Sequence, residues 1–212
     1  MTTEPHRAFE IERKYDADAD TPLPDWSDLP GVRRVTPGEE RALDARYFDT
    51  ADAALARAGV ALRRRTGGPA EGWHIKGPLA GAGRVELGWP LDDDGRLPQG
   101  VAEAVAQWTR NALHPLARIE NDRTAYHLLG DDGVVAEFVD DHVTATDLRD
   151  GTQRVWREWE MELGPAAPEG DAEQQAFFAA VERAVLVAAG GGRAAPGRAH
   201  PPAPALAAPR PR

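Results

Sequence analysis

Glutamates occupy every second position in two distant stretches of the sequence: Glu10 and Glu12 in the first, and Glu158, Glu160 and Glu162 in the second. Residues two apart in a β-strand share a face and lie about 6.6 Å apart. At an effective dielectric constant near 20, neighbouring carboxylates at this distance repel by about 2 kcal/mol. A cation is therefore expected opposite them. Surface arginines could supply it, but oxygen ligands on two strands also suit Mg²⁺ or Mn²⁺.

Basic residues with a similar spacing lie between these stretches. Of the 25 basic residues only Lys14 and Lys76 are lysines, which indicates that an ammonium group is needed at these two positions. The other candidates are Arg63, Arg65, Arg84 and Arg123. Each alone fits a solvated surface charge. Together, cationic strands flanked by carboxylate strands favour a site that binds a polyanion through Arg and Lys and its metal through Glu.

The composition excludes several other kinds of chemistry. The chain has no Cys, which excludes disulfides and thiolate nucleophiles, and its single serine, Ser27, lies outside any nucleophile-elbow pattern. Neither lysine completes a GxxxxGK phosphate loop, and no histidine pair has the HExxH spacing. The formal net charge is −10, and the four arginines of residues 190–212 leave residues 1–189 at −14, which argues against a nucleic-acid partner.

Strand patterns dominate the 212 residues. Alternation or β-rich composition predicts strands at 7–15, 42–49, 60–66, 72–77, 83–91, 116–129, 133–141, 142–149 and 153–163. Helices are expected at 50–58, 99–112 and 171–189, and an irregular connection with a short helix at 16–40. The predicted fold is α+β, an eight-stranded antiparallel closed β-barrel with helices packed outside. The charged faces would line its interior.

The sequence divides into one predicted domain and a tail. Residues 1–189 are expected to form the domain, whereas residues 190–212 are rich in Pro, Ala and Arg and are expected to be disordered. No stretch reaches the ~18 apolar residues of a membrane span, and the N-terminus is charged where a signal peptide would be apolar. We therefore expect a cytoplasmic protein without a membrane partner.

Several motifs, in order, resemble the CYTH superfamily, the triphosphate tunnel metalloenzymes. The ExExK signature reads Glu10-Ile11-Glu12-Arg13-Lys14, and Tyr47-Phe48-Asp49-Thr50 follows it. The run Leu62-Arg63-Arg64-Arg65 matches an LRxR element, and Trp73-His74-Ile75-Lys76-Gly77-Pro78 matches a WTxKxP-like element with His in place of Thr. Arg84, Arg123, the acidic segment 137–141 and the strand 158–163 complete the resemblance, which covers about residues 6–188.

The resemblance implies roles for individual residues. Metal ligands would be Glu10, Glu12, Glu158, Glu160 and Glu162. Asp140 and Asp141 compete for one further acidic position, and Asp141 is preferred because it shares its face with Glu137. Phosphate ligands would be Lys14, Arg63, Arg65, Lys76, Arg84 and Arg123. Glu10, Glu12, Lys14 and Lys76 would form the catalytic set.

The resemblance also implies a function: hydrolysis of a triphosphate with Mg²⁺ or Mn²⁺ as cofactor. Inorganic triphosphate is the preferred substrate, since the sequence holds no dedicated base-binding motif. An adenylate cyclase and a non-catalytic polyphosphate or nucleotide sensor are the alternatives. The sequence leaves open whether the protein is a monomer or a homodimer.

Overall fold

The computed structural model describes residues 4–91 and 96–190. The strands are β1 (His6–Glu10), β2 (Glu12–Ala17), β3 (Arg34–Val35), β4 (Glu39–Asp49), β5 (Ala61–Thr66), β6 (Gly72–Ala80), β7 (Gly83–Trp89), β8 (His114–Leu129), β9 (Val134–Asp147) and β10 (Gln153–Leu163). The helices are α1 (Ala54–Arg57), α2 (Gln99–Val105) and α3 (Asp171–Ala188).

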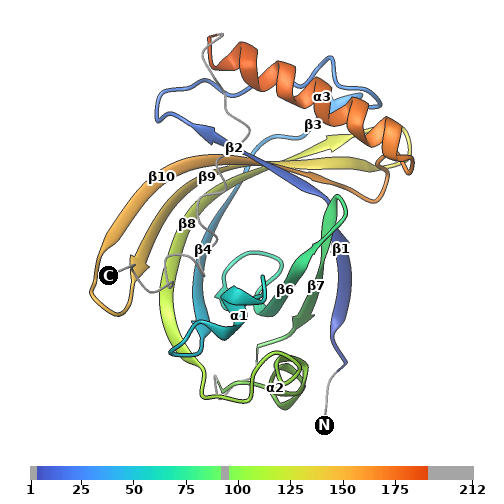
Figure 1. The fold of residues 1–212 in the computed structure, drawn as a ribbon. Coiled ribbons are helices and arrows are strands. Elements are labelled where there is room, and N and C mark those ends of the chain that lie inside the picture. The colour runs from blue at the N-terminus through green and yellow to red at the C-terminus, as the bar shows by residue number, and fades with distance from the viewer. Residues whose placement is uncertain (1–3, 92–95, 191–212) are drawn as a thin grey trace.

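All strands belong to one antiparallel sheet that curls strongly, as Figure 1 shows. Its order is β1-β7-β6-β5-β4-β8-β9-β10-β2, and β3 pairs with β8. The strands at the two ends of this order, β1 and β2, are separated in the sequence only by Ile11. One N-terminal segment thus pairs with β7 through its first half and with β10 through its second half.

The α+β class and the antiparallel sheet are confirmed, and the sheet curls into a half-barrel. Within the described residues it has ten strands and not the eight predicted, because the N-terminal strand divides at Ile11 and the short β3 is added. The two strands predicted at 133–141 and 142–149 are one continuous strand, β9, because no Gly or Pro interrupts this stretch. Closure into a complete barrel stays a prediction.

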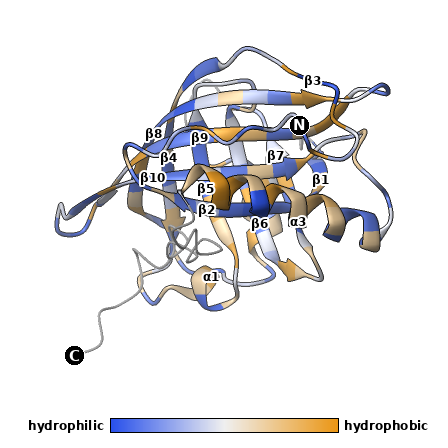
Figure 2. Cartoon of the chain, turned by 90° about the horizontal axis from the view of Figure 1, so that it is seen from above, coloured by the Kyte–Doolittle hydropathy of each residue, from blue (hydrophilic) through white to orange (hydrophobic). Residues whose placement is uncertain are grey.

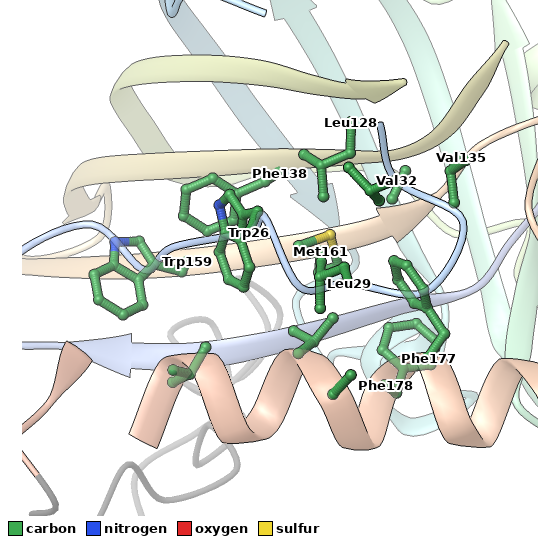
Figure 3. Close-up of a cluster of buried hydrophobic side chains, with 14 of the residues drawn as sticks. Trp26, Leu29, Val32, Leu128, Val135, Phe138, Trp159, Met161, Phe177 and Phe178 are labelled. Carbon is green, nitrogen blue, oxygen red and sulfur yellow. The ribbon is translucent and has the colours of Figure 1, made fainter. Parts of the chain in front are cut away.

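The apolar side chains of β2, β8, β9 and β10 pack against α3 outside the curl of the sheet. Trp159 and Met161 alternate with the glutamates of β10 and are fully buried, together with Phe138 of β9 and Phe177 of α3. Figure 3 shows these side chains between the strands and the helix, and Figure 2 shows hydrophilic and hydrophobic residues interspersed along the strands. The expectation that the apolar faces turn outward under helices is confirmed here.

A second apolar cluster lies where α1 and α2 cover β5, β6 and β7. Leu55 of α1 and Val101 of α2 pack with Leu62, Trp73 and Ile75 of the strands. The cluster fixes the outer face of strands that carry Arg63, Arg65 and Lys76 at the alternate positions.

The buried carboxylate of Asp49 binds backbone N–H groups at the start of α1. It accepts hydrogen bonds from the backbone N–H groups of Thr50, Leu55 and Ala56 at 2.7–2.9 Å. The Oγ1 of Thr50 accepts a further bond from Ala54 N. The Asp-Thr pair therefore has a capping role in this structure.

The helices differ in length from the expectation. The helix expected at 99–112 ends at Val105, and turns fill the described segment between Ala106 and β8. No helix forms in segment 16–40, where β2, β3 and turns occur. The tail from residue 191 lies outside the described residues. Within 4–91 and 96–190, none of the helices is long and apolar enough to cross a membrane.

Candidate active site

Three carboxylates from two adjacent strands converge on the concave face of the sheet. Asp141 of β9 stands opposite Glu158 of β10, and Glu160 follows two residues later on the same face. One oxygen of each lies within 4.8 Å of the others, and Asp141 is 1% exposed. The alternation of Glu with Trp and Met along β10 produces this grouping, since the apolar residues turn to α3.

The neighbouring Asp140 points to the opposite side. Its carboxylate accepts two hydrogen bonds from Arg157, at 2.8 and 3.0 Å, and one from the indole N–H of Trp159 at 3.0 Å. Trp159 belongs to the apolar core beneath α3. The structure thus brings Asp141, not Asp140, to the carboxylate group.

Two of the predicted phosphate ligands neutralise this acidic group. Arg123 donates to both oxygens of Asp141 at 2.7 Å and to Glu160 at 3.0 Å. Lys14 forms ion pairs with Glu160 and, at 3.4 Å, with Glu158. Burial would lower the pKa of Arg123, but the hydrogen bond and charge of Asp141 outweigh burial and raise it.

A second charged group surrounds Lys76 on the side of β1, β6 and β7. The Lys76 ammonium lies 2.7 Å from Glu10 and 3.3 Å from Glu86. Burial and Arg63 would lower its pKa, but Glu12, Glu86 and Glu10 outweigh them and raise it. The expected cation opposite Glu10 is thus a lysine from another strand, which alternation along one strand could not reveal.

Glu12 lies between the two groups. Burial alone would raise its pKa, but Lys76, Lys14, Arg84 and Arg63 together hold it below its usual value. Arg84 stands directly opposite Glu10 in the β1–β7 pair. The ExExK residues therefore face cations from several strands.

Arg63 and Arg65 of β5 add two further cations to the concave face. Burial, followed by the charges of Arg63 and Arg123, lowers the pKa of Arg65 to about 10. The buried Nε of Arg63 has no hydrogen-bond partner among the described residues. A buried donor without an acceptor is costly, so these arginines are suited to an anionic ligand.

Glu162 has the opposite environment. Burial raises its pKa to about 7, and the charges of Glu10, Glu12 and Glu137 contribute to the increase. It pairs in register with Glu12 on one side and Glu137 on the other. Glu162 shares the predicted face but is not part of the Asp141, Glu158 and Glu160 group.

Sequence reasoning left two residues out of the site. Glu86 contacts Lys76 directly, and its alternation with Arg84 was the only signal for it. Tyr47 lies beside Arg63, which forms a hydrogen bond with the phenol. Burial would raise the pKa of Tyr47, but Arg63, Lys76 and Lys14 together lower it.

The carboxylate group fits a hard divalent cation. It offers three oxygen donors within 4.8 Å of one another, no sulfur or nitrogen ligand, and two cations that a metal could displace toward phosphate. The donors do not discriminate Mg²⁺ from Mn²⁺.

Comparisons with known proteins agree with this architecture. The CYTH domain family matches residues 8–183. Two uncharacterized proteins of Mycobacterium tuberculosis, MT2285 from strain CDC 1551 and Rv2226 from strain H37Rv, are each 37% identical over 172 residues, which cover 75% of this chain and 34% of the relative. The chain spans about a third of the length of these relatives.

A crystal structure from Bacillus halodurans shares the fold. That protein carries a provisional name as an adenylate cyclase, and it superposes with a TM-score of 0.59 at 19% identity. The match covers 92% of this chain and 96% of that chain. At this identity the likeness concerns the fold alone.

Proposed function

Because the chain belongs to the CYTH domain family, we propose that it is a divalent-metal-dependent hydrolase of triphosphates, with inorganic triphosphate as the preferred substrate. One observation carries the proposal: on one sheet face, the cations Lys14 and Arg123 are paired with the carboxylates suited to a metal. The curled sheet would enclose the substrate as a tunnel, since one segment supplies the strands at both ends of the sheet order.

The charged side chains would exchange partners when substrate binds. Asp141, Glu158 and Glu160 would hold the metal, with Glu10, Glu12 and Glu162 as further candidates. Lys14 and Arg123 would turn from carboxylates to phosphate oxygens, joining Arg63, Arg65, Lys76 and Arg84. A bound Mg²⁺ or Mn²⁺ supplies positive charge to the phosphate oxygens and activates water.

The reaction needs no covalent nucleophile. The oxygen of a water attacks the terminal phosphorus in line, the bond from this phosphorus to the bridging oxygen breaks, and phosphate and diphosphate leave. Bidentate arginines and the Lys76 ammonium would orient the chain of phosphates and stabilise the charge on its oxygens. The cytoplasmic location and the lack of a nucleic-acid partner stay predictions.

The test is phosphate release from inorganic triphosphate, thiamine triphosphate and ATP, each with Mg²⁺, with Mn²⁺ and with excess EDTA. We expect metal-dependent release, fastest from inorganic triphosphate. Formation of cyclic AMP and diphosphate from ATP would instead show a cyclase. Tight binding of inorganic triphosphate without any turnover would show a sensor.

A further inference from the structure

His74 and Glu86 form a buried pair on the concave face, directly beside Lys76. His74 Nδ1 lies 2.6 Å from Glu86 Oε1, and the two side chains are 8% and 11% exposed. The other ring nitrogen, Nε2, lies 3.0 Å from the carbonyl oxygen of Ala70. Both nitrogens of His74 are thus engaged by oxygen atoms.

The partners of the ring fix its orientation. A carbonyl oxygen only accepts, so Nε2 donates a hydrogen bond to Ala70. Nδ1 lies at hydrogen-bond distance from Glu86 Oε1. The ring therefore links the Glu86 carboxylate to the backbone of the loop.

The carbonyl of Ala70 is held in place by its loop. It also accepts hydrogen bonds from Arg65 Nε at 3.1 Å and Nη2 at 2.6 Å, so Arg65 and His74 converge on one oxygen. Gly67 in this loop has φ +80°, and a Cβ there would lie 2.1 Å from the carbonyl oxygen of Ala42. The conformation of the turn that carries Ala70 therefore depends on Gly67, which is not one of the charged residues.

Glu86 connects His74 to two of the predicted phosphate ligands. Its second oxygen, Oε2, is buried and makes no hydrogen bond among the described residues, but lies 3.3 Å from Lys76 Nζ and 3.7 Å from Arg63 Nη2. One oxygen of the carboxylate thus binds His74, and the other faces the two cations.

We propose that His74 is a positioning residue that fixes Glu86 and, through it, Lys76 and Arg63 for polyphosphate. This inference rests on the proposed function. It assigns His74 no contact with phosphate, because both of its ring nitrogens already have oxygen partners. With Oε1 bound to His74, only Oε2 of Glu86 faces the two cations. Without His74, both oxygens of Glu86 would compete with phosphate for these cations.

Binding of an analogue that resists hydrolysis tests the proposal independently of turnover. The probe is diimidotriphosphate with Mg²⁺, measured by calorimetry. We expect His74→Leu, which cannot donate, to weaken binding about tenfold. His74→Gln retains an amide donor and should lose less than about threefold. His114→Gln, at an exposed histidine, is the matched control and should bind like the wild type.

A double-mutant cycle tests the route through Glu86. If His74 acts through this carboxylate, His74→Leu has little further effect in a Glu86→Gln background. Equal losses in both backgrounds would overturn the proposal, as would wild-type binding by His74→Leu.

Nitrogen-15 NMR of the unmodified protein gives a readout that does not depend on any variant folding. A ring N–H proton of His74 should exchange slowly with water, because the buried ring is held between Glu86 and Ala70, whereas fast exchange would overturn the proposal. Steady-state kinetics should show a raised KM for inorganic triphosphate with kcat nearly unchanged in His74→Leu. Binding of the analogue without phosphate release from triphosphate would refute the hydrolase and leave the role of His74 intact.

Discussion

Arg123 and Asp141 face each other as a two-bond pair, with Nε–Oδ1 and Nη2–Oδ2 distances both 2.7 Å. The same guanidinium reaches Glu160 at 3.0 Å. Arg123, a predicted phosphate ligand, is therefore hydrogen-bonded to two predicted metal ligands. A metal bound to Asp141 and Glu160 would free Arg123 for phosphate, and triphosphate bound to Arg123 would free these carboxylates for the metal. Each ligand should therefore raise the affinity for the other.

Asp141→Asn should lower kcat/KM for triphosphate by about 100-fold or more at moderate Mg²⁺, since even groups that only support a metal ligand contribute 10- to 100-fold. Phosphate release over a Mg²⁺ titration checks this. Asp140→Asn is the matched control on the opposite face: it should lose about 1–3 kcal/mol of stability through Trp159 and Arg157, and keep metal-dependent release. Full activity of Asp141→Asn would argue against its role as a ligand.

Lys76→Met and Arg65→Met should affect the metal-free protein differently. Lys76 is paired with Glu10 and Glu86, so its loss leaves buried carboxylates uncompensated and should cost about 2 kcal/mol, below the cost for fully buried pairs. Arg65 has a lowered pKa because of burial and of Arg63 and Arg123, and relief from these effects offsets the two hydrogen bonds that it donates to Ala70, so its loss should change stability by less than about 1 kcal/mol.

Urea unfolding in EDTA measures both effects, and both variants should raise KM for triphosphate. Equal destabilisation by the two substitutions would show that the hydrogen bonds of Arg65 to Ala70 outweigh its repulsion from the neighbouring arginines.

Glu86 should contribute to the loss of unfolding free energy at acid pH. Its folded-state pKa is lowered from 4.5, so its contribution is present above pH 4.5 and is lost as the pH falls below this value. Glu86→Gln should therefore flatten the decline in unfolding free energy as the pH falls from about 5 toward the much lower folded-state pKa. Urea unfolding across this range checks the slope, with the exposed Glu71→Gln as control. An unchanged slope in Glu86→Gln would contradict the assignment.

Asp49→Ala should destabilise the protein by about 2 kcal/mol, because two backbone N–H groups of α1 and that of Thr50 lose their acceptor. Asp49→Asn retains one acceptor oxygen and should cost less. KM for triphosphate should stay the same in both, because Asp49 supports the helix and not the charged face. Thermal unfolding and phosphate release measure the two effects, and a raised KM without a lower melting temperature would instead place Asp49 in the site.

Alternation was enough to predict the two faces of β10, because Trp159 and Met161 can only be buried under a helix if the glutamates turn the other way. The grouping of Glu158 with Asp141 depends on strand register, which parity with Glu137 indicated only partly. Glu86 lies on β7, whereas its partners His74 and Lys76 lie on β6. Alternation within one strand cannot predict contacts between two strands. The division of the first strand at Ile11 follows from its two different partners, β7 and β10, which lie far apart in the sequence.

The placement of β1 and β2 at the two ends of the sheet order has a consequence for synthesis. The ribosome makes the N-terminal segment first, but the partner of β2 is β10, at residues 153–163. Residues 12–17 therefore remain without their strand partner β10 until most of the chain has been synthesised. Pairing over such a sequence separation is slow, and an exposed strand edge during the delay is prone to wrong contacts. A nascent chain stalled before β10 should consequently be the form of this protein most dependent on chaperones.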